Sequence, residues 1–354
     1  MTAFLTELND YDELNETFIS LHMLEDDPKT YDEAVSSLDA SLWKDAIKSE
    51  IESIMSNHTW ELVDMPKGNK AIGCKWIFKK KLKIDGSVER YNARLVVKGF
   101  TQKQGIDFFD TYSPVTKIST IRALFSLDSS YKLLVYQVDV KTVFLNGDLN
   151  EEIYMEQPPR CVVPGQKNKV CRLKKSLYGL KQAPKQWYEK FHKTILSFGF
   201  KVNGSDACVY SKMFGKDCVI ICLYVDGMLI FGTHLNVINT TKQFLSSQFD
   251  MKDLGEANVI LGVKVTRIEN GFTLSQPHYV EKMLKKFNQF DVVPVRTPYD
   301  SSMQLMKNCG ESISQNEYAK VIGSLMFLMN CTPPDIAYAV SRLSRYTHNP
   351  SKDH

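Results

Sequence analysis

Apolar residues recur at helical spacing near the start of the chain. Between residues 41 and 54 they stand three and four positions apart, which predicts a helix that begins near Asp39 or Ser41, both able to cap it. Residues 1–40 have no sustained apolar period and are predicted to form a poorly ordered, acidic leader. The expected apolar face of the helix consists of Leu42, Ala46, Ile47, Ile51 and Ile54.

A β-rich pattern follows this helix. Residues 60–63 and 75–83 are strand candidates, and the Asp85-Gly86 pair predicts a tight turn that joins 75–83 to 91–99 as a hairpin. Glycine allows the positive φ that such a turn needs. The apolar run 133–140 is predicted to be a buried strand.

The second half of the chain predicts two more hairpins and most of the helices. The run 218–231 is almost wholly apolar but is interrupted at Asp226-Gly227, and 256–275 turns near Asn270-Gly271. Ser275 and Pro277 are expected to open the next helix, by capping and by a preset φ. Predicted helices cover 118–127, 183–198, 237–248, 278–287, 315–330 and 335–346. This order of elements predicts an α+β fold, because it lacks the βαβα alternation of a doubly wound sheet.

The composition is that of a globular protein. The chain has 354 residues, of which 43% are hydrophobic and 24% charged, so two or three structural units are expected. No apolar run approaches the roughly 18 residues of a membrane span, and the start does not resemble a secretory signal. The eight cysteines form no CxxC pair, which favours free thiols in a reducing, intracellular compartment.

Charge is distributed unevenly. Residues 1–40 hold eleven acidic side chains and one basic, a net charge of −10, whereas the remainder holds 43 basic and 30 acidic side chains, a net charge of +13. An acidic leader ahead of a basic body is one signature of a protein that meets polyanions such as nucleic acid. A solvated, charged surface without such a partner is the alternative.

Two aspartates stand inside otherwise apolar strands. Asp139 follows Leu-Leu-Val-Tyr-Gln-Val, and Asp226 follows Val-Ile-Ile-Cys-Leu-Tyr-Val. A buried carboxylate is costly unless it is paired or bound to a metal, so two of them at neighbouring strand ends predict a divalent-metal site suited to Mg²⁺. For Asp226 the alternative is an ordinary Asp-Gly hairpin turn that binds no metal.

Two further segments could contact phosphates or bases. Residues 75–103 contain nine basic and two acidic residues, interleaved with aromatic side chains, and the alternative is an edge hairpin whose lysines resist aggregation. Within 176–187, Gly179 allows close backbone approach, Lys181 and Lys185 supply charge, and Tyr178 and Trp187 supply stacking faces. The alternative for this segment is a plain helix N-terminus that starts near Pro184.

Taken in order along the chain, these motifs resemble the reverse transcriptase region of copia-type LTR retrotransposon Pol polyproteins. The resemblance runs from about residue 28 to 349. The stretches that carry it are WKDAIKSE (43–50), NHTWELV (57–63), GCKWIFK (73–79), YNARLVVKGFTQ (91–102), QVDVKTVFLNGD (137–148), SLYGLKQAPKQW (176–187) and YVDG (224–227). It implies a right-hand polymerase with fingers, palm and thumb, built around an antiparallel palm sheet flanked by helices.

The resemblance also assigns boundaries and partners. Fingers and palm are expected over 41–270 with the fingers hairpin at 75–103, a thumb-like segment over 271–312, and the start of a connection region over 313–354, with no RNase H domain after it. The implied reaction adds a dNTP to a primer 3′-end on an RNA or DNA template, with Mg²⁺, or Mn²⁺ in its place. A polyprotein fragment with other retrotransposon segments as partners, in a cytoplasmic particle or the nucleus, is expected.

Site residues follow from the resemblance position by position. Asp139 and Asp226 fall on the catalytic, metal-binding aspartates, Phe144 on the aromatic residue beside the sugar 2′ position, and Arg94 on the arginine that contacts the triphosphate. Which of three neighbouring lysines assists that arginine is left open. Lys79, Gly179 and Gln182 are expected beside the nucleotide; Lys80, Lys81, Lys98, Tyr178, Lys181, Lys185, Leu261 and Gly262 are expected on nucleic acid.

One position departs from the family pattern. The polymerase signature of the family has two adjacent aspartates, and here Gly227 stands in the second place. Glycine has no side chain with which to bind a metal, so two of three carboxylates remain. The sequence therefore predicts an impaired polymerase, with a catalytically inactive nucleic-acid-binding remnant of the same fold as the alternative.

Overall fold

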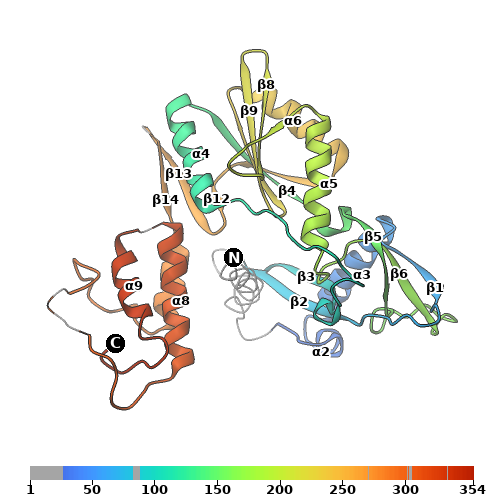
Figure 1. Cartoon of the computed structure of the whole chain (residues 1–354), viewed down its shortest axis with the longest axis horizontal. Helices are drawn as coiled ribbons and strands as arrows, with labels where there is room; N and C mark the ends of the chain where they lie inside the picture. The colour runs from blue at the N-terminus through green and yellow to red at the C-terminus, as the bar shows by residue number, and fades with distance from the viewer. Residues whose placement is uncertain (1–26, 83–87, 270, 301, 303–304, 333) are drawn as a thin grey trace. The chain divides into compact units, whose positions relative to one another are not determined.

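The structure is a computed structural model that describes the chain apart from residues 1–26, 83–87, 270, 301, 303–304 and 333 (Figure 1). Contacts divide the chain into two units, and each unit is described by itself. The first consists of residues 1–114 and 141–198, and the second of 115–140 and 199–354. Both units mix helices with antiparallel sheets, so the α+β class is confirmed.

A two-stranded hairpin packed on a helix forms one part of the first unit. Trp76, Phe78, Ala93 and Leu95 alternate along the hairpin and are buried, because successive side chains of a strand face opposite sides. Trp43 of the helix meets Phe78 edge-on, with ring centroids 5.4 Å apart. These elements are α2 (Tyr31–Ser36), α3 (Ala40–Ser56), β2 (Cys74–Leu82) and β3 (Val88–Val97).

A three-stranded sheet with the order β1-β6-β5 completes the core of the first unit. Its central strand contributes Cys171 and Leu173 to the same hydrophobic cluster as α3 and the hairpin. The elements are β1 (Trp60–Asp64), the turns η1 (Gly99–Thr101) and η2 (Val143–Asn146), β5 (Asp148–Met155), β6 (Lys169–Lys175) and α5 (Ala183–Ser197).

An antiparallel sheet with the order β11-β4-β10-β9-β8-β7 is the centre of the second unit. Phe231 packs against Phe125 of α4, and the next residue, Gly232, packs against Ile238 of α6. Because alternate residues of a strand face opposite sides, these two helices cover opposite faces of the sheet. The elements are α4 (Ile118–Tyr131), β4 (Leu134–Val140), β7 (Lys201–Val202), β8 (Val209–Phe214), β9 (Asp217–Tyr224), β10 (Gly227–Gly232), α6 (Leu235–Gln248) and β11 (Met251–Glu256).

A small sheet and three helices form the rest of the second unit. The buried carboxylate of Asp128 on α4 accepts from Arg267 on β13 at 3.2 Å, which fastens this sheet to α4. The elements are β12 (Val259–Ile260), β13 (Val263–Ile268), β14 (Gly271–Ser275), α7 (Pro277–Lys286), α8 (Gln315–Cys331), η3 (Pro334–Ile336) and α9 (Ala337–Ser344). Among the described helices, none combines the length and the hydropathy that a membrane crossing requires.

Several sequence predictions need correction. In the predicted leader, residues 31–36 form α2 and Ala34 is fully buried; residues 1–26 lie outside the described part. Leu42 was expected on the apolar face of α3 but is 46% exposed, and Trp43 is buried instead. Ser275 ends β14, so Gln276 rather than Ser275 precedes α7, whereas Pro277 opens that helix as predicted. The predicted turn at Asp85-Gly86 lies outside the described residues.

Candidate active site

One predicted catalytic aspartate lies in a strand of the six-stranded sheet, and the other lies in the turn before the adjacent strand. Asp139 on β4 pairs with Gly227, the first residue of β10. The backbone N–H of Val140 donates to the carbonyl oxygen of Asp226 at 2.9 Å. Asp226 therefore lies at the end of the strand that neighbours Asp139, where the sequence predicts the two residues to meet.

The hairpin turn at Asp226 differs from the predicted Asp-Gly turn. Tyr224 pairs with Gly227, so the turn residues are Val225 and Asp226, one position earlier than expected. Val225 has φ 55°, a left-handed conformation that is costly for a β-branched residue. Gly227 lies in the strand without a left-handed φ, so the backbone at this position does not require glycine.

Space is available at Gly227 for a side chain. A Cβ there meets the carbonyl oxygen of Tyr224 at 3.7 Å, an ordinary van der Waals distance, and no closer atom of the described residues. Residues paired across an antiparallel ladder direct their side chains to the same face, so such a side chain lies on the face of Asp139. The geometry therefore accommodates a carboxylate at the position where the family signature has one.

A lysine that the sequence analysis missed flanks Asp139 on its other side. Lys252 on β11 pairs with Asp139 across the ladder and is exposed. Its charge lies on the same face as the aspartate because paired residues share a face. The sequence holds no signal for this contact, since the pairing of β11 with β4 joins segments more than a hundred residues apart.

The donor set at this strand end suits a hard divalent cation. Mg²⁺ prefers oxygen ligands and is held by one or two carboxylates together with substrate phosphates and water. Asp139 supplies a carboxylate from β4, and Asp226 supplies one from the turn before the adjoining strand β10. No group of three or more His, Cys, Asp or Glu side chains suited to a metal occurs within the described residues. The residue types of Asp139 and Asp226 fit a divalent cation, and metal binding stays a prediction.

Arg94 in the first unit forms an ion pair with a buried carboxylate. Its Nη1 atom donates to Glu50 Oε2 at 2.6 Å, and Glu50 is 2% exposed while the Arg94 side chain is 37% exposed. Burial raises the pKa of Glu50, and Arg94 offsets this in part. Burial also opposes the charge on Arg94, but Glu50 and Tyr178 together raise its pKa. Burial and the opposite charge of the partner therefore act in opposite directions on each member of the pair.

Two predicted nucleotide residues and one predicted nucleic-acid residue of the first unit lie together. The Arg94 guanidinium is 5.4 Å from the ring centroid of Tyr178, and that ring meets Phe144 edge-on at 4.9 Å. Tyr178 also accepts from the Val97 N–H at 2.8 Å through its carbonyl oxygen. Trp187, expected to offer a stacking face, is instead 2% exposed in the core. The structure thus groups Arg94, Tyr178 and Phe144.

Gly179 requires its glycine. Its φ is +90°, and a Cβ would stand 2.1 Å from the carbonyl oxygen of Val97. Gly99 is equally constrained, since a Cβ there would stand 1.8 Å from the carbonyl oxygen of Gly179. The close approach at Gly179 is made by backbone atoms of the hairpin, and contact of Gly179 with a nucleotide stays a prediction.

Both polar atoms of the Gln182 side chain form hydrogen bonds within the fold. Its Oε1 accepts from Gln102 Nε2 at 3.0 Å, its Nε2 donates to the Asp107 carbonyl oxygen at 2.9 Å, and its exposure is 0%. Gln102 Oε1 in turn accepts from the Lys181 N–H at 2.8 Å. A direct nucleotide contact of Gln182 stays a prediction, and it requires exposure of a side chain that is fully buried.

Several of the predicted phosphate-binding lysines have acidic or aromatic neighbours. Lys80 Nζ is 2.9 Å from Asp39 Oδ2, and the hydrogen bond from Lys80 lowers the pKa of that carboxyl. Lys181 stands over the Phe108 ring at 4.9 Å. Lys79 and Lys81 share the opposite hairpin face with Arg94, since they alternate with the buried residues of β2. Lys98 is exposed beyond the end of β3.

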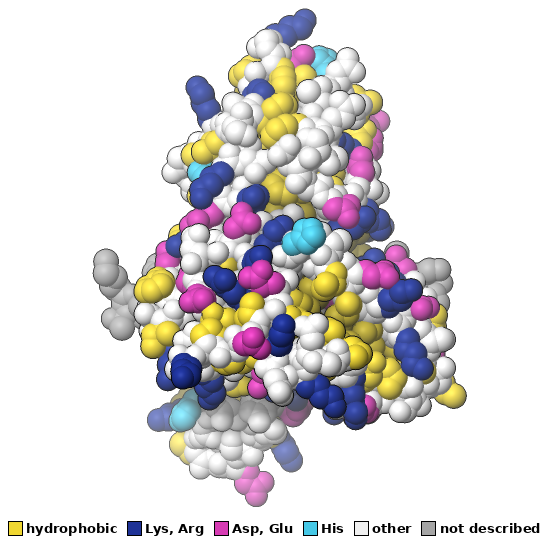
Figure 2. Space-filling model, turned by 90° about the vertical axis from the view of Figure 1, so that its right-hand side faces the viewer, with side chains coloured by type: hydrophobic (Ala, Val, Ile, Leu, Met, Phe, Trp, Pro, Cys, Tyr) yellow, Lys and Arg dark blue, Asp and Glu magenta, His cyan; other side chains and the backbone are white. Residues whose placement is uncertain are grey.

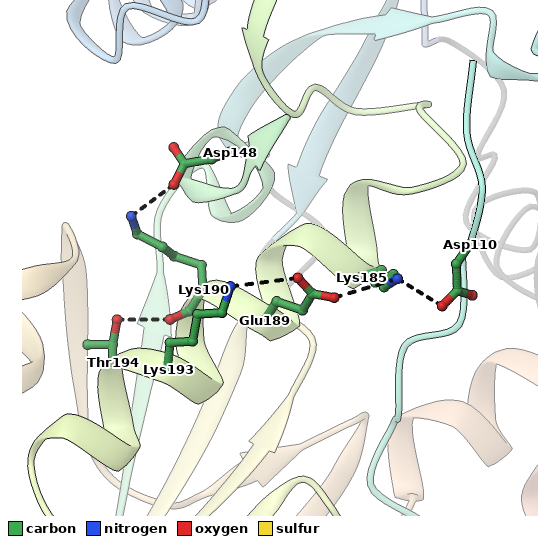
Figure 3. A network of polar contacts seen from close by, with 7 residues as sticks. All are labelled: Asp110, Asp148, Lys185, Glu189, Lys190, Lys193 and Thr194. Atoms are coloured by element: carbon green, nitrogen blue, oxygen red, sulfur yellow. Dashed lines mark hydrogen bonds and ion pairs between the residues drawn. The ribbon is translucent and has the colours of Figure 1, made fainter. Parts of the chain in front are cut away.

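Lys185 belongs to a network of contacts along α5 (Figure 3). It binds Asp110 at 2.8 Å and Glu189 at 3.6 Å, and the hydrogen bond from Lys185 lowers the pKa of Asp110. Further along α5, Lys190 binds Asp148 at 3.1 Å beside a cleft of about 420 Å³. Figure 2 shows the same mixture over one face, where basic and acidic side chains alternate. This surface is therefore charge-balanced rather than uniformly basic.

The residues predicted to grip the primer form a tight turn. Ile260 pairs with Val263, so Leu261 and Gly262 are the two turn residues, with φ 53° and 75°. Positive φ at both central positions defines the type I′ hairpin turn. Leu261 also packs against the hydrophobic cluster around Phe125 and Phe231. Contact of this turn with nucleic acid stays a prediction.

Comparisons with known proteins agree with the motifs. The family model described as Reverse transcriptase (RNA-dependent DNA polymerase) matches residues 57–301. The chain belongs to the reverse transcriptase family. The resemblance to the reverse transcriptase region of copia-type retrotransposon Pol polyproteins is also confirmed by the relatives, and the right-hand subdivision into fingers, palm and thumb stays a prediction.

Three relatives illustrate the similarity. The retrovirus-related Pol polyprotein from transposon TNT 1-94 of Nicotiana tabacum is 46% identical over 338 residues, 93% of this chain and 26% of that protein. The polyprotein from transposon RE1 of Arabidopsis thaliana is 39% identical over 332 residues, which are 93% of this chain and 22% of that protein. The putative transposon Ty5-1 protein of Saccharomyces cerevisiae is 33% identical over 221 residues, which are 61% of this chain and 71% of that protein.

The chain spans about a quarter of the length of the two plant relatives. Among solved structures, an apo telomerase from Candida tropicalis truncated from its C-terminal domain matches with a TM-score of 0.32 and 9% identity. That match covers 67% of this chain and 60% of the telomerase chain, and its score is too low to define the fold.

Proposed function

We propose that the chain is an RNA-directed DNA polymerase region that adds dNTPs to a primer 3′-end, and that Gly227 impairs it. The observation that carries this proposal is the pairing of Asp139 with Gly227, next to Asp226, at one end of the six-stranded sheet. The family membership supports the reaction class. In this assignment the six-stranded sheet is the palm, the β2–β3 hairpin belongs to the fingers, and α7 begins the thumb.

Asp139 and Asp226 are the residues that would hold divalent metal ions. When bound there, Mg²⁺ or Mn²⁺ lowers the pKa of the primer 3′-hydroxyl and neutralises charge that develops on the α-phosphate. One carboxylate comes from β4 and the other from the turn before β10, so the attacking hydroxyl and the dNTP would meet at this end of the sheet. Lys252, opposite Asp139, adds a positive charge on the same face.

Residues of the first unit would receive the nucleotide. Arg94 has a planar guanidinium suited to forked contacts with phosphate oxygens, with one of Lys79, Lys80 and Lys81 beside it. Phe144, packed on Tyr178, would crowd the sugar 2′ position and so favour deoxynucleotides. The RNA or DNA template with its primer and other segments of a Pol polyprotein are the partners that fit this role.

Gly227 favours a second candidate function. Without a third carboxylate, repulsion between two dications is offset less completely, so the rate is expected to fall by orders of magnitude. A chain with the same fold could then bind primer and template without extending the primer. Nucleic-acid binding that depends on salt, without metal-dependent incorporation of dNTPs, defines this alternative.

Primer extension with matched variants tests both candidates. The native chain and Gly227→Asp are compared on an RNA template with Mg²⁺ or Mn²⁺, with Gly227→Asn as a control of equal size but no charge. We expect extension to rise at least tenfold in Gly227→Asp alone, and Asp139→Asn to abolish it in that background. Equal rates for the native chain and Gly227→Asp would refute the impairment, and extension that survives Asp139→Asn would refute the assigned site.

A further inference from the structure

Glu50 is a buried carboxylate at a helix position where an apolar residue fits the pattern. It stands three residues after Ile47 and four before Ile54, both of which are buried on the same face of α3. An ionised group in such a place costs several kcal/mol before its partner is counted, and a hydrophobic side chain of similar volume is often as stable or more so. Packing alone therefore gives no reason for a carboxylate at this position.

The contacts of Glu50 are made with β3 at Arg94 and the next residue. Oε2 accepts from Arg94 Nη1 at 2.6 Å, and Oε1 accepts from the Leu95 N–H at 3.4 Å. Two residues further, the Val97 N–H donates to the carbonyl oxygen of Tyr178. Glu50 and Tyr178 thus bind neighbouring N–H groups on one edge of β3, because alternate N–H groups of a strand point the same way.

The Arg94 side chain is bound by Glu50 and remains partly exposed to solvent. A guanidinium carries five N–H donors, so a carboxylate that engages Nη1 leaves capacity for a phosphate. The side chain of Arg94 is 37% exposed, and its guanidinium packs on the Tyr178 ring, which in turn packs on Phe144. A continuous series of contacts therefore runs from Glu50 through Arg94 and Tyr178 to Phe144.

We propose that Glu50 is a positioning residue, which holds Arg94 and, through Tyr178, Phe144 in the arrangement that receives a dNTP. The inference rests on the proposed function, in which Arg94 meets the triphosphate and Phe144 the sugar. Glu50 lowers the net positive charge near the phosphates, so its contribution is orientation rather than attraction. Holding a group ready in its bound geometry removes an ordering cost from binding.

Two substitutions separate positioning from stability. Glu50→Gln keeps the size and a hydrogen-bond acceptor for the Leu95 N–H but loses the charge, and Glu50→Met fills the space with an apolar chain. In the Gly227→Asp background, we expect either variant to raise the KM for a dNTP about tenfold with a smaller change in kcat, and to lower the preference for dNTP over rNTP. Glu61→Gln is the matched control, because Glu61 on β1 pairs with Lys174 elsewhere in the same unit.

A purely structural role predicts the opposite pattern. In that case the thermal midpoint would fall while the KM and the dNTP preference stay as in the parent, and the proposal would be overturned. A double-mutant cycle with Arg94→Lys is a second test. If Glu50 acts through Arg94, Glu50→Gln should cause little further rise in the KM for a dNTP once Arg94 is replaced. Additive effects of the two substitutions on KM would contradict the proposal.

A binding measurement keeps this test separate from the proposed reaction. Calorimetric titration with a complementary dNTP, using the native chain on a primer–template whose primer lacks the 3′-hydroxyl, measures binding without turnover. We expect the Kd to rise about tenfold in Glu50→Gln, equivalent to about 1.4 kcal/mol. An unchanged Kd overturns the role of Glu50 even if the primer-extension assay shows activity. A tenfold rise supports that role even if Gly227→Asp extends no primer and the reaction itself is refuted.

Discussion

Gly227 lies directly opposite Asp139 in the ladder between β10 and β4, with an ordinary strand backbone and room for a side chain. This relationship has a consequence for stability that is independent of turnover. In Gly227→Asp, two carboxylates face each other across the ladder, and like charges so placed are destabilising by about 0.2–1 kcal/mol. A bound divalent cation reverses this, since a ligand of the folded state stabilises it.

We therefore expect Gly227→Asp to melt slightly below the native chain in a chelator and above it in millimolar Mg²⁺. Differential scanning calorimetry with and without Mg²⁺ measures both shifts. Gly227→Asn, which adds no charge, should show neither. A Mg²⁺ response that is equal in all three chains would contradict metal binding at this pair of strands.

Gly179 differs from Gly227 in what its backbone demands. Gly179→Ala would bring a Cβ to 2.1 Å from the Val97 carbonyl oxygen at a φ of +90°, so we expect a loss of at least about 3 kcal/mol in unfolding free energy. Gly204→Ala is the control, because a Cβ there meets no described atom within 4 Å. Urea denaturation of both variants measures the difference in unfolding free energy. Equal midpoints would contradict the close contact between Gly179 and the Val97 carbonyl oxygen.

The Asp128–Arg267 pair predicts a pH-dependent stability. Burial raises the pKa of Asp128 in the folded state, and Arg267 offsets this in part. Since Arg267→Met removes that compensation, the folded pKa rises further above the unfolded value. The unfolded carboxyl then loses its proton at lower pH than the folded one, so the variant loses stability as the pH rises through the folded pKa.

We expect Arg267→Met to cost about 2–3 kcal/mol at pH 8 and distinctly less at pH 5. Urea denaturation of the native chain and the variant at both pH values measures this. Arg172→Met is a suitable control, because Arg172 pairs with exposed carboxylates at 3.5 and 3.8 Å. The same loss at both pH values would contradict the account of Asp128.

The cysteines should differ widely in reactivity. All eight are free thiols, and burial raises the pKa of Cys74, Cys171, Cys208 and Cys222 to about 12 in each case. The thiolate is the reactive form, so these four should resist iodoacetamide at pH 8, while the exposed Cys309 reacts readily. Peptide mass spectrometry before and after addition of urea measures the labelling. Rapid labelling of Cys222 in the folded protein would contradict its buried position.

The strands of the six-stranded sheet are predictable from sequence for a physical reason. β10 is almost wholly buried, and β4 and β9 contain only buried and half-buried residues. These strands therefore stand out as apolar runs, and an aspartate inside such a run is conspicuous. β5 and β6 lack this signal because polar residues alternate along them. Their pairing with β1 depends on contacts between distant segments, which a local pattern cannot specify.

The two aspartates of the candidate active site were predictable from the sequence, but the residues around them were less so. Asp139 and Asp226 follow from pattern and resemblance, but the turn lies at Val225 and Asp226, because the register of the hairpin, not the Asp-Gly pair, decides which residues turn. Glu50 had one local signal, a carboxylate on the apolar stripe of α3. Lys252 had none, because its relation to Asp139 exists only through the sheet.

Neither unit is continuous in sequence. The chain passes between them after Pro114, Val140 and Phe198, and the strand that carries Asp139 is inserted, as residues 115–140, between two parts of the other unit. A premature stop codon upstream of residue 199 would therefore leave both units incomplete. Such truncations should yield no independently folding product, whereas a single-residue substitution leaves the chain of both units complete.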